Sequence, residues 1–202
     1  MCDTGYTVKQ LIEHLRELRD GAKSEHEILD VVPLLARRLA GMKHNWLRPY
    51  MCQPAESPAD GASVFPLHEE PDHSLAVFVV TWMPGDETPP HDHGTWAVIA
   101  GLEGHETNHW WTRVDDGHTA GYAEVERSGS QRIDSDSCIA MPGDAIHSLH
   151  NDSDGVSITL HLYGRNVNHT DRFRFDPVGH TMTRYRMGGT VTAAPSRQEV
   201  IC

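Results

Sequence analysis

Residues 85–104 read GDETPPHDHGTWAVIAGLEG, and this stretch decides the fold. His91 and His93 stand two residues apart, so on an extended strand their imidazoles point to the same face and can reach one point in space. Asp92, between them, points to the opposite face. Histidine pairs also occur on strands by chance, so this pair indicates a metal site only together with a further ligand elsewhere in the chain.

Short strands broken by turn residues surround this stretch. Runs rich in β-branched and aromatic residues predict strands at 75–82, 95–102, 105–114, 138–142 and 156–164. Gly, Asp and Ser separate these runs, and no helical pattern lies between them. The pattern favours an all-β sandwich or barrel, which we expect over residues 62–186.

The first part of the chain predicts helices instead. Thr7 with Gln10, and Ser24 with Glu27, mark the starts of two amphipathic helices, each followed by apolar residues on one face. We expect this layer to rest its apolar face on the sheet. Pro33 lies inside the second segment, and we expect it to kink that helix or to split it in two.

Length and composition narrow the class of protein. With 202 residues, the chain is long enough for one domain and short for two, so we expect a single domain over 1–202, with helices within 1–45 and a tail at 187–202. The chain has 17 Lys and Arg against 29 Asp and Glu, which gives a net charge of −12. This charge, and the absence of a basic cluster in the sequence, argue against nucleic-acid binding. No apolar run approaches the roughly 18 residues that span a bilayer.

The cysteines and the N-terminus point to the cytoplasm. Cys2, Cys52, Cys138 and Cys202 are scattered and form no CxxC pair, which favours a reducing compartment. The opening MCDTGYTVKQ has neither the basic nor the apolar region of a secretory signal. We therefore expect a cytoplasmic protein that binds neither nucleic acid nor membrane.

The spacing around the histidine pair resembles the first signature of the cupin proteins. Five residues separate Gly85 from His91, three separate His93 from Ala97, and six separate Ala97 from Gly104. One residue departs from the pattern, because cupins usually carry glutamate where this chain has Ala97.

A second segment, Pro142-Gly-Asp-Ala-Ile-His147, is followed three residues later by Asn151 and resembles the second cupin signature, with Asp144 where glycine is common. Two signatures in this order imply a mainly β cupin jelly-roll barrel with an N-terminal helical layer, and His147 as the third metal ligand. His150 is the rival ligand, but its odd spacing from His147 turns it to the other strand face.

His91, His93 and His147 would together hold one divalent metal ion. Three neutral imidazoles and no carboxylate leave the ion its full charge and open coordination positions, which favours an anionic ligand such as a thiolate. Imidazole ligands suit iron, zinc, copper and nickel alike. The alternative is a metal-free cupin whose histidines are buried and hydrogen-bonded.

Thr159, His161 and Tyr163 alternate in the run TLHLY, where they can form a hydrogen-bonded relay on one strand face. The alternative is a half-buried strand whose polar residues face water. A three-histidine cupin site followed by a Ser-x-His-x-Tyr strand resembles the thiol dioxygenases of the cysteine dioxygenase family, with Thr159 in the serine position. The resemblance implies one Fe(II) per chain and addition of both atoms of O2 to a thiol, giving a sulfinate. It also implies that His161 and Tyr163 orient substrate and oxygen, and that Thr159 holds the His161 tautomer.

Residues 94–104 contain no cysteine, whereas mammalian-type members of the family carry one shortly after the histidine pair and crosslink it to the tyrosine. We therefore expect Tyr163 to be an unmodified phenol. Together with the HDHGTW opening, this departure resembles the bacterial branch of the family, which includes 3-mercaptopropionate dioxygenase.

That branch anchors the substrate carboxylate with an arginine shortly after the tyrosine, and Arg172 occupies this place. A guanidinium can bind a carboxylate through two parallel hydrogen bonds. Arg174, on the same strand face by parity, is the second candidate, and Arg48 is a weaker one. The alternative is that these arginines pair with surface acids such as Asp171 or Asp176.

The expected function is that of a non-haem Fe(II) thiol dioxygenase whose partners are O2 and a small thiol-carboxylate, such as 3-mercaptopropionate, cysteine or mercaptosuccinate. Two alternatives stay open at this point. One is another metal-dependent cupin enzyme, such as a dioxygenase that attacks carbon or an isomerase. The other is a cupin that binds a small molecule without catalysis. Ala97 and the TLHLY strand favour the thiol dioxygenase.

Overall fold

The structure is a computed structural model that describes residues 5–22, 24–53 and 62–186, so the tail expected at 187–202 lies outside the described residues. The N-terminal part is helical: α1 (Val8–Gly21), α2 (Glu25–Ala40), α3 (Lys43–Trp46) and the 3-10 turn η1 (Pro49–Cys52). The remainder is built from strands: β1 (Ala62–Glu69), β2 (Ala76–Trp82), β3 (Ala97–Glu103), β4 (His105–Arg113), β5 (Val125–Asp134), β6 (Cys138–Met141), β7 (Ile146–His150), β8 (Ser157–Tyr163), β9 (Phe173–Asp176) and β10 (Thr181–Arg184). A 3-10 turn, η2 (Val167–His169), lies between β8 and β9.

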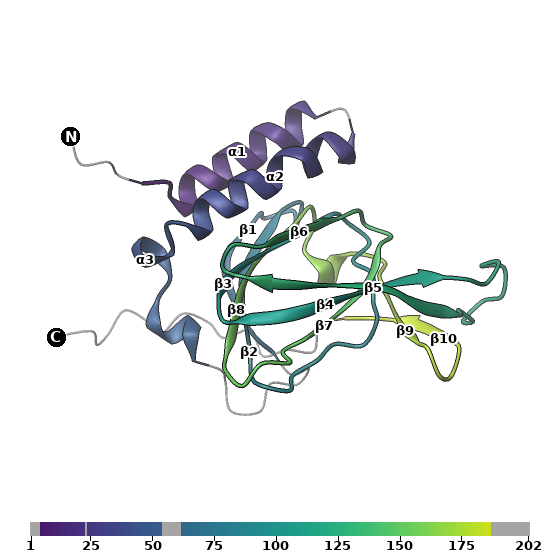
Figure 1. Ribbon diagram of the computed structural model, residues 1–202. Coiled ribbons are helices and arrows are strands. Elements are labelled where there is room, and N and C mark those ends of the chain that lie inside the picture. The colour runs from purple at the N-terminus through teal and green to yellow at the C-terminus, as the bar shows by residue number, and fades with distance from the viewer. Residues whose placement is uncertain (1–4, 23, 54–61, 187–202) are drawn as a thin grey trace.

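The strands form the two facing sheets of a jelly roll (Figure 1). One sheet has the order β1-β2-β8-β3-β6, the other has the order β5-β4-β7, and β9 and β10 form a separate hairpin. The pairs between these neighbours are antiparallel. An apolar core between the two sheets joins residues of β2 and β3 to residues of β5 and β7. The predicted mainly β jelly-roll barrel with an N-terminal helical layer is confirmed.

Both long helices begin where the sequence predicts. The Thr7 side chain accepts a hydrogen bond from the backbone amide of Gln10, and the Gln10 side chain accepts one from the amide of Thr7. Ser24 likewise accepts a hydrogen bond from the amide of Glu27 at the start of α2. These caps satisfy amides that have no partner within the first helical turn.

Helix α2 runs without a break through Pro33, so the expected split is wrong. A proline inside a helix removes one backbone hydrogen bond and normally interrupts the helix. Here Val32 and Ala36, on either side of the proline, are fully buried in the core between helices and sheet. This packing holds the helix together across the missing hydrogen bond.

Strand β8 has no side that faces solvent. Its even-numbered residues join the core beneath α1 and α2: Ile158, Leu160 and Leu162. Its odd-numbered residues face the barrel interior: Ser157, Thr159, His161 and Tyr163. The central strand of the larger sheet therefore contacts the helical layer, which covers one face of that sheet (Figure 1), and lines the candidate site on its other face.

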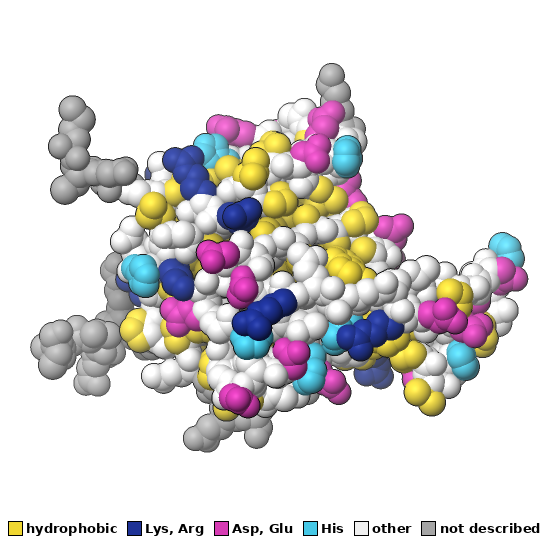
Figure 2. Space-filling model, in the orientation of Figure 1, with side chains coloured by type: hydrophobic (Ala, Val, Ile, Leu, Met, Phe, Trp, Pro, Cys, Tyr) yellow, Lys and Arg dark blue, Asp and Glu magenta, His cyan; other side chains and the backbone are white. Residues whose placement is uncertain are grey.

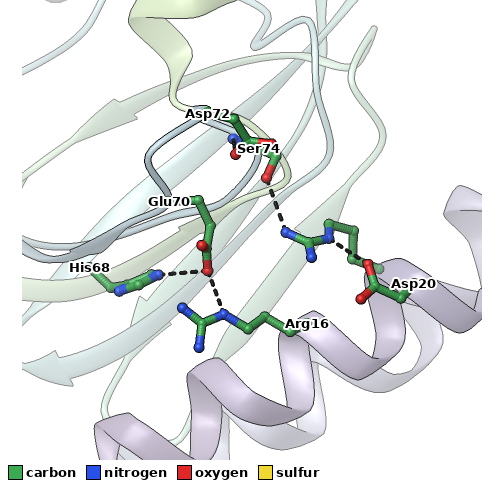
Figure 3. A network of polar contacts seen from close by, with 7 residues as sticks. Arg16, Asp20, His68, Glu70, Asp72 and Ser74 are labelled. Carbon is green, nitrogen blue, oxygen red and sulfur yellow. Dashed lines mark hydrogen bonds and ion pairs between the residues drawn. The ribbon is translucent and has the colours of Figure 1, made fainter.

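Polar contacts fasten α1 to the β1–β2 hairpin (Figure 3). Arg16 donates from Nε to Oε1 of Glu70 at 2.6 Å, and Nε2 of His68 lies 3.0 Å from the same oxygen. One helical turn further on, Arg19 donates to Oγ of Ser74 at 3.0 Å. Exposed ion pairs contribute about 0–1 kcal/mol each, so the apolar core supplies most of the attachment.

Two glycines in β3 and its following turn are required by close backbone approach. Gly104 has a φ of +64°, and a Cβ there would lie 2.2 Å from the carbonyl oxygen of Val156. At Gly101, a Cβ would lie 1.8 Å from the carbonyl oxygen of Asp134. A side chain at either position would force neighbouring backbone apart, so glycine keeps the barrel closed here.

Charged side chains of both signs are mixed on the surface. On the face that Figure 2 shows, Lys and Arg are scattered among Asp and Glu without a basic patch. Within the described residues, no helix is both long enough and apolar enough to cross a membrane.

Candidate metal centre

Backbone pairing brings His91, His93 and His147 together inside the barrel. The His91 amide donates to the His147 carbonyl at 2.8 Å, and the His147 amide donates back at 2.9 Å. The ring of His93 lies 5.1 Å from that of His91 and 4.8 Å from that of His147, centroid to centroid. The three residues are 5%, 2% and 0% exposed, and one nitrogen from each lies within 4.8 Å of the other two.

Hydrogen bonds at the outer nitrogens orient two of these rings. Nδ1 of His91 lies 2.9 Å from the Pro89 carbonyl oxygen, and Nδ1 of His147 lies 2.7 Å from Oδ1 of Asn108. Both oxygens are acceptors, so each Nδ1 carries the proton and donates. Each ring therefore keeps its Nε2 lone pair for the interior, as metal-ligating histidines do.

The charge and spacing of the rings fit a divalent metal ion. Burial, reinforced by Arg172, lowers the pKa of His91 to about 3, and burial holds the pKa of His93 and of His147 well below the usual value. All three are therefore neutral at pH 7. The Nε2 atoms of His93 and His147 lie 3.4 Å apart. Metal–nitrogen bonds of about 2.0–2.1 Å place two ligand nitrogens at about this separation, so the group can hold a metal ion.

His150, the rival ligand, lies outside this group. It is half-buried at the end of β7, opposite Thr107 on β4, whereas His147 is fully buried. The three-residue spacing therefore separates the two side chains as the strand alternation predicts.

Thr159, His161 and Tyr163 form a continuous hydrogen-bonded row beside the histidine group. Nε2 of His161 lies 3.0 Å from Oγ1 of Thr159, and Nδ1 lies 2.8 Å from the Tyr163 hydroxyl. The Tyr163 ring lies 5.1 Å from the His93 ring. Burial lowers the pKa of His161 to about 3 and raises the pKa of Tyr163, so the row is uncharged at neutral pH. The alternative of a polar face toward water does not hold, because all three residues are buried.

Arg172 is buried, 2% exposed, and lines the same cavity. Its Nε donates to the backbone carbonyl of Tyr185 at 3.2 Å, and its guanidinium carbon lies 4.2 Å from the centre of the Tyr185 ring. The Tyr185 ring also lies 5.4 Å from that of His91. Tyr185 therefore holds the guanidinium against the histidine group.

The other two candidate arginines lie outside the cavity. Arg174 is exposed and donates from Nε to Oγ1 of Thr183 across the β9–β10 hairpin, and Arg48 is exposed before η1. The expectation that Arg172 and Arg174 share a strand face is wrong, because Arg172 precedes β9, where strand alternation does not yet apply. Asp171, expected as a surface partner, pairs instead with Arg184.

The three histidines, His161 and Tyr163 of the relay, and Arg172 line one small cavity of about 60 Å³. Its polar side is formed by Thr88, His91, His93, His147, His161, Tyr163, Arg172 and Tyr185. Its apolar side is formed by Ala62, Val64, Val80, Trp82 and Leu149. One buried cation together with apolar lining residues in so small a volume suits a small organic anion, not a nucleotide or a polymer.

The described cysteines lie away from Tyr163. Cys52 and Cys138 are both free, and Cys138 packs into the core on the helix side of the sheet. Burial raises the pKa of the Cys138 thiol to about 11. Across β3 and β8, the residue opposite Tyr163 is Ala97, whose methyl group offers nothing for a crosslink.

Sequence reasoning missed three residues of the site. Asn108 orients His147, Tyr185 holds Arg172, and the buried carboxyl of Glu106 hydrogen-bonds Ser157 next to the relay. Glu106 and Asn108 of β4 stand two apart in the run ETN, so strand alternation could have placed both on the interior face. Tyr185 lies beyond both signatures, and no local pattern marks it.

A second cluster, Glu69, His73 and His169, also brings potential ligands within 4.8 Å of one another. The two imidazoles stack face to face, with centroids 3.5 Å apart and planes 8° from parallel. Lone pairs lie in the ring plane, so parallel rings do not aim them at a common point. This exposed cluster is therefore a hydrogen-bonded stack and not a preformed metal site.

Comparison with known proteins adds similarity of fold. No family model matches the sequence. Oxalate oxidase in complex with the substrate analogue glycolate is similar at 15% identity and a TM-score of 0.43, over 56% of each chain. DMSP lyase DddQ from Ruegeria pomeroyi DSS-3 is similar at 20% identity and a TM-score of 0.40, over 56% of this chain and 51% of the lyase. The cupin domain of Cnp3 from Schizosaccharomyces pombe gives 16% identity and a TM-score of 0.39, over 55% and 70%.

The similarity spans about half of the oxidase and lyase chains. Fold and site together define a jelly-roll barrel with a candidate three-histidine metal centre.

Proposed function

We propose that the protein is a non-haem Fe(II) thiol dioxygenase that adds both atoms of O2 to the sulfur of a small thiol-carboxylate, such as 3-mercaptopropionate or cysteine, and gives the sulfinate. One observation carries the proposal: Arg172 and the three-histidine group line the same small cavity. A thiolate binds a metal and a carboxylate binds a guanidinium, so the cavity matches both ends of such a substrate.

Arg172 binds the substrate carboxylate. Its side chain is held at Nε by the Tyr185 carbonyl and on one face by the Tyr185 ring. A guanidinium held in this way presents its other N–H groups in one plane, which matches the two oxygens of a carboxylate. Because Arg172 is buried, little water competes for this contact.

His91, His93 and His147 would hold Fe(II), which supplies the redox chemistry that joins O2 to the thiolate sulfur. The three rings stay neutral, so they leave the positive charge of the site for the anionic substrate. Tyr163 lines the same cavity, with its ring 5.1 Å from that of His93, and its hydroxyl can hydrogen-bond the reacting groups. His161 and Thr159 fix the orientation of that hydroxyl through their row of hydrogen bonds.

Oxygen uptake tests the proposal. Protein loaded anaerobically with Fe(II) is mixed with 3-mercaptopropionate, cysteine or mercaptosuccinate, and the product is identified by mass spectrometry. We expect O2 uptake with formation of the sulfinate, and slower turnover of 2-mercaptoethanol, which lacks the carboxylate. Absence of O2 uptake with every thiol would contradict the proposal.

The same preparation distinguishes the alternatives. Stoichiometric metal without sulfinate would indicate another metal-dependent cupin enzyme, and absence of bound transition metal would indicate a cupin that binds a small molecule without catalysis. A cytoplasmic location suits the proposed reaction, because small thiols stay reduced there.

A further inference from the structure

Glu106 of β4 is a fully buried carboxyl group that the proposed reaction does not yet use. Ser157 donates from Oγ to its Oε2 at 3.1 Å, while Oε1 has no hydrogen-bond partner among the described residues. Burial raises the pKa of Glu106 to about 8, although hydrogen bonding to Ser157 and Thr159 opposes the shift. A buried carboxyl with one oxygen unsatisfied is costly to keep unless it serves another group.

Glu106 stands at the end of the polar row on β8. Ser157 and Thr159 follow one another on the interior face of the strand, and both interact with the carboxyl. Thr159 in turn contacts His161, which contacts Tyr163. Thr159 and His161 thus stand between a buried acid on β4 and the Tyr163 phenol in the cavity.

We propose that Glu106 is a positioning residue that sets the direction of the hydrogen bonds in the relay, and through them the direction in which the Tyr163 hydroxyl points. This inference rests on the proposed function, since it assigns the relay a role in orienting substrate.

The direction follows from counting donors. A protonated Glu106 can donate from Oε1, which has no partner among the described residues, to the Thr159 hydroxyl beside it, so that the Thr159 hydroxyl donates to Nε2 of His161. His161 then carries its proton on Nδ1 and donates to the Tyr163 oxygen, which leaves the phenol proton free to point into the cavity.

An ionised Glu106 reverses each bond. The Thr159 hydroxyl then donates to the carboxylate and accepts from Nε2 of His161, and Nδ1 of His161 accepts the proton of the Tyr163 hydroxyl. The phenol proton is withdrawn from the cavity. His161 remains neutral in both states, because burial holds its pKa near 3, so the change is one of tautomer and not of charge.

Among the described residues, the polar side chains that affect the protonation of Glu106 are Ser157 and Thr159. On β5, the residue opposite it is Ile133, which is apolar and buried. On β8, Ser157 and Thr159 face it, and further along that strand Tyr163 is close enough for Glu106 to raise its pKa. Among the described residues, no Lys, Arg or His side chain shifts the pKa of Glu106.

The His161 tautomer tests the inference without turnover. The full chain is loaded with Zn(II), labelled with nitrogen-15 in its histidine rings, and titrated by NMR between about pH 6 and about pH 10. Nitrogen shifts distinguish the two tautomers, and the variant His161→Asn identifies the signals. We expect His161 to change from the Nδ1–H to the Nε2–H tautomer with a midpoint near the Glu106 pKa of about 8.

Variants separate the role of Glu106 from that of its surroundings. Glu106→Gln cannot ionise and is expected to abolish the tautomer change, whereas Glu126→Gln, an exposed position on β5, is expected to keep it. Ser157→Ala removes the hydrogen bond that lowers the Glu106 pKa, so it should move the midpoint to higher pH. The variant Ser157→Ala keeps the test decisive if Glu106→Gln does not fold.

Two results would overturn the inference: a His161 tautomer that stays constant in the wild-type chain, or a change that persists in Glu106→Gln. Neither result depends on O2 uptake, so failure of this inference and failure of the proposed function can be told apart. If the reaction is observed, its decline above about pH 8 should disappear in Glu106→Gln and remain in Glu126→Gln.

Discussion

The Nε2 atoms of His93 and His147 lie 3.4 Å apart in the buried interior of the barrel. Both rings are neutral, because burial holds the pKa of each well below its usual value. Two nitrogen lone pairs at this distance repel each other unless a proton or a cation lies between them. A metal ion bound between them would satisfy both lone pairs, with His91 as the third ligand.

Loss of His147 should abolish metal binding. His147→Ala removes one of three ligands from a site that has no carboxylate to replace it. We expect stoichiometric metal in the wild-type protein after anaerobic loading and less than about a tenth of it in the variant. The measurement is metal content by mass spectrometry after gel filtration. His150→Ala, on the same strand but outside the group, is the control and should keep its metal.

Asn108 should matter for metal affinity although it is not a ligand. Its Oδ1 accepts the Nδ1–H of His147 at 2.7 Å and so holds the ring in the ligating tautomer. Removing such a partner costs about 10- to 100-fold in metal affinity. Competition with a chromogenic chelator measures this for Asn108→Ala. Gln131→Ala, at the exposed position opposite Asn108 on β5, is the control and should keep the metal affinity of the wild type. Equal metal affinities for Asn108→Ala and Gln131→Ala would contradict this prediction.

Arg172 should determine affinity for the carboxylate. Hydrogen bonds to charged groups contribute about 1.5–3 kcal/mol, so Arg172→Lys or Arg172→Ala should raise KM for 3-mercaptopropionate about 10- to 100-fold. The metal content should not change. Steady-state O2 uptake gives KM and kcat, and Arg174→Ala, outside the cavity, is the matched control. An unchanged KM in the Arg172 variants would leave Arg172 without the role proposed here.

Tyr163 should remain an unmodified phenol during turnover. Its neighbours across the sheet are Ala76 and Ala97, and Cys138 is partly buried on the helix side. We expect the intact mass after many turnovers to equal the mass calculated from the sequence, without the loss of two hydrogens that a thioether crosslink requires. A peptide map that joins Tyr163 to any cysteine would contradict this expectation.

Glu106 should make the folded state less stable at high pH. Its folded pKa of about 8 lies above the ordinary carboxyl value of 4.5, so between these pH values the folded state holds a proton that the unfolded state has lost. The free energy of unfolding should therefore fall as pH rises through this window, by at most about 1.4 kcal/mol per pH unit from this group. Urea unfolding at several pH values measures the slope. Glu106→Gln should flatten it, while Glu126→Gln should not.

The sequence predicted those elements whose pattern is set locally. Each of the five expected strand runs contains a strand, and both predicted helix caps are present. Strands β1, β5, β7, β9 and β10 were not among the predicted runs. Strand β5 gives no clear pattern because it is largely exposed on both faces and buries only Val125 and Ile133 near its ends. An edge strand with little buried surface carries no alternation for a pattern to detect.

The residues of the candidate site likewise divide into those that a local sequence pattern predicts and those that it does not. His91, His93 and His147 could be proposed from spacing, because a signature fixes their order along paired backbone segments. Asn108 and Tyr185 could not, because their roles depend on which side chain lies opposite after the barrel has closed. The parity argument for Arg174 failed for a related reason: it treated residues 172–174 as one strand, and β9 begins at Phe173.

The two-sided burial of β8 limits how its sequence can change. A substitution at Leu160 alters the core beneath the helices, and one at Thr159 or His161 alters the relay. In neither case can the new side chain turn toward solvent, because both faces of the strand are buried. Displacement of the strand by a larger residue on the helix side would shift the relay on the other side by a similar amount. Substitutions in this strand should therefore be tolerated mainly when a second substitution in α1 or α2 compensates for them. The helices that pack on the outer face of the sheet thus help to keep the relay residues in position.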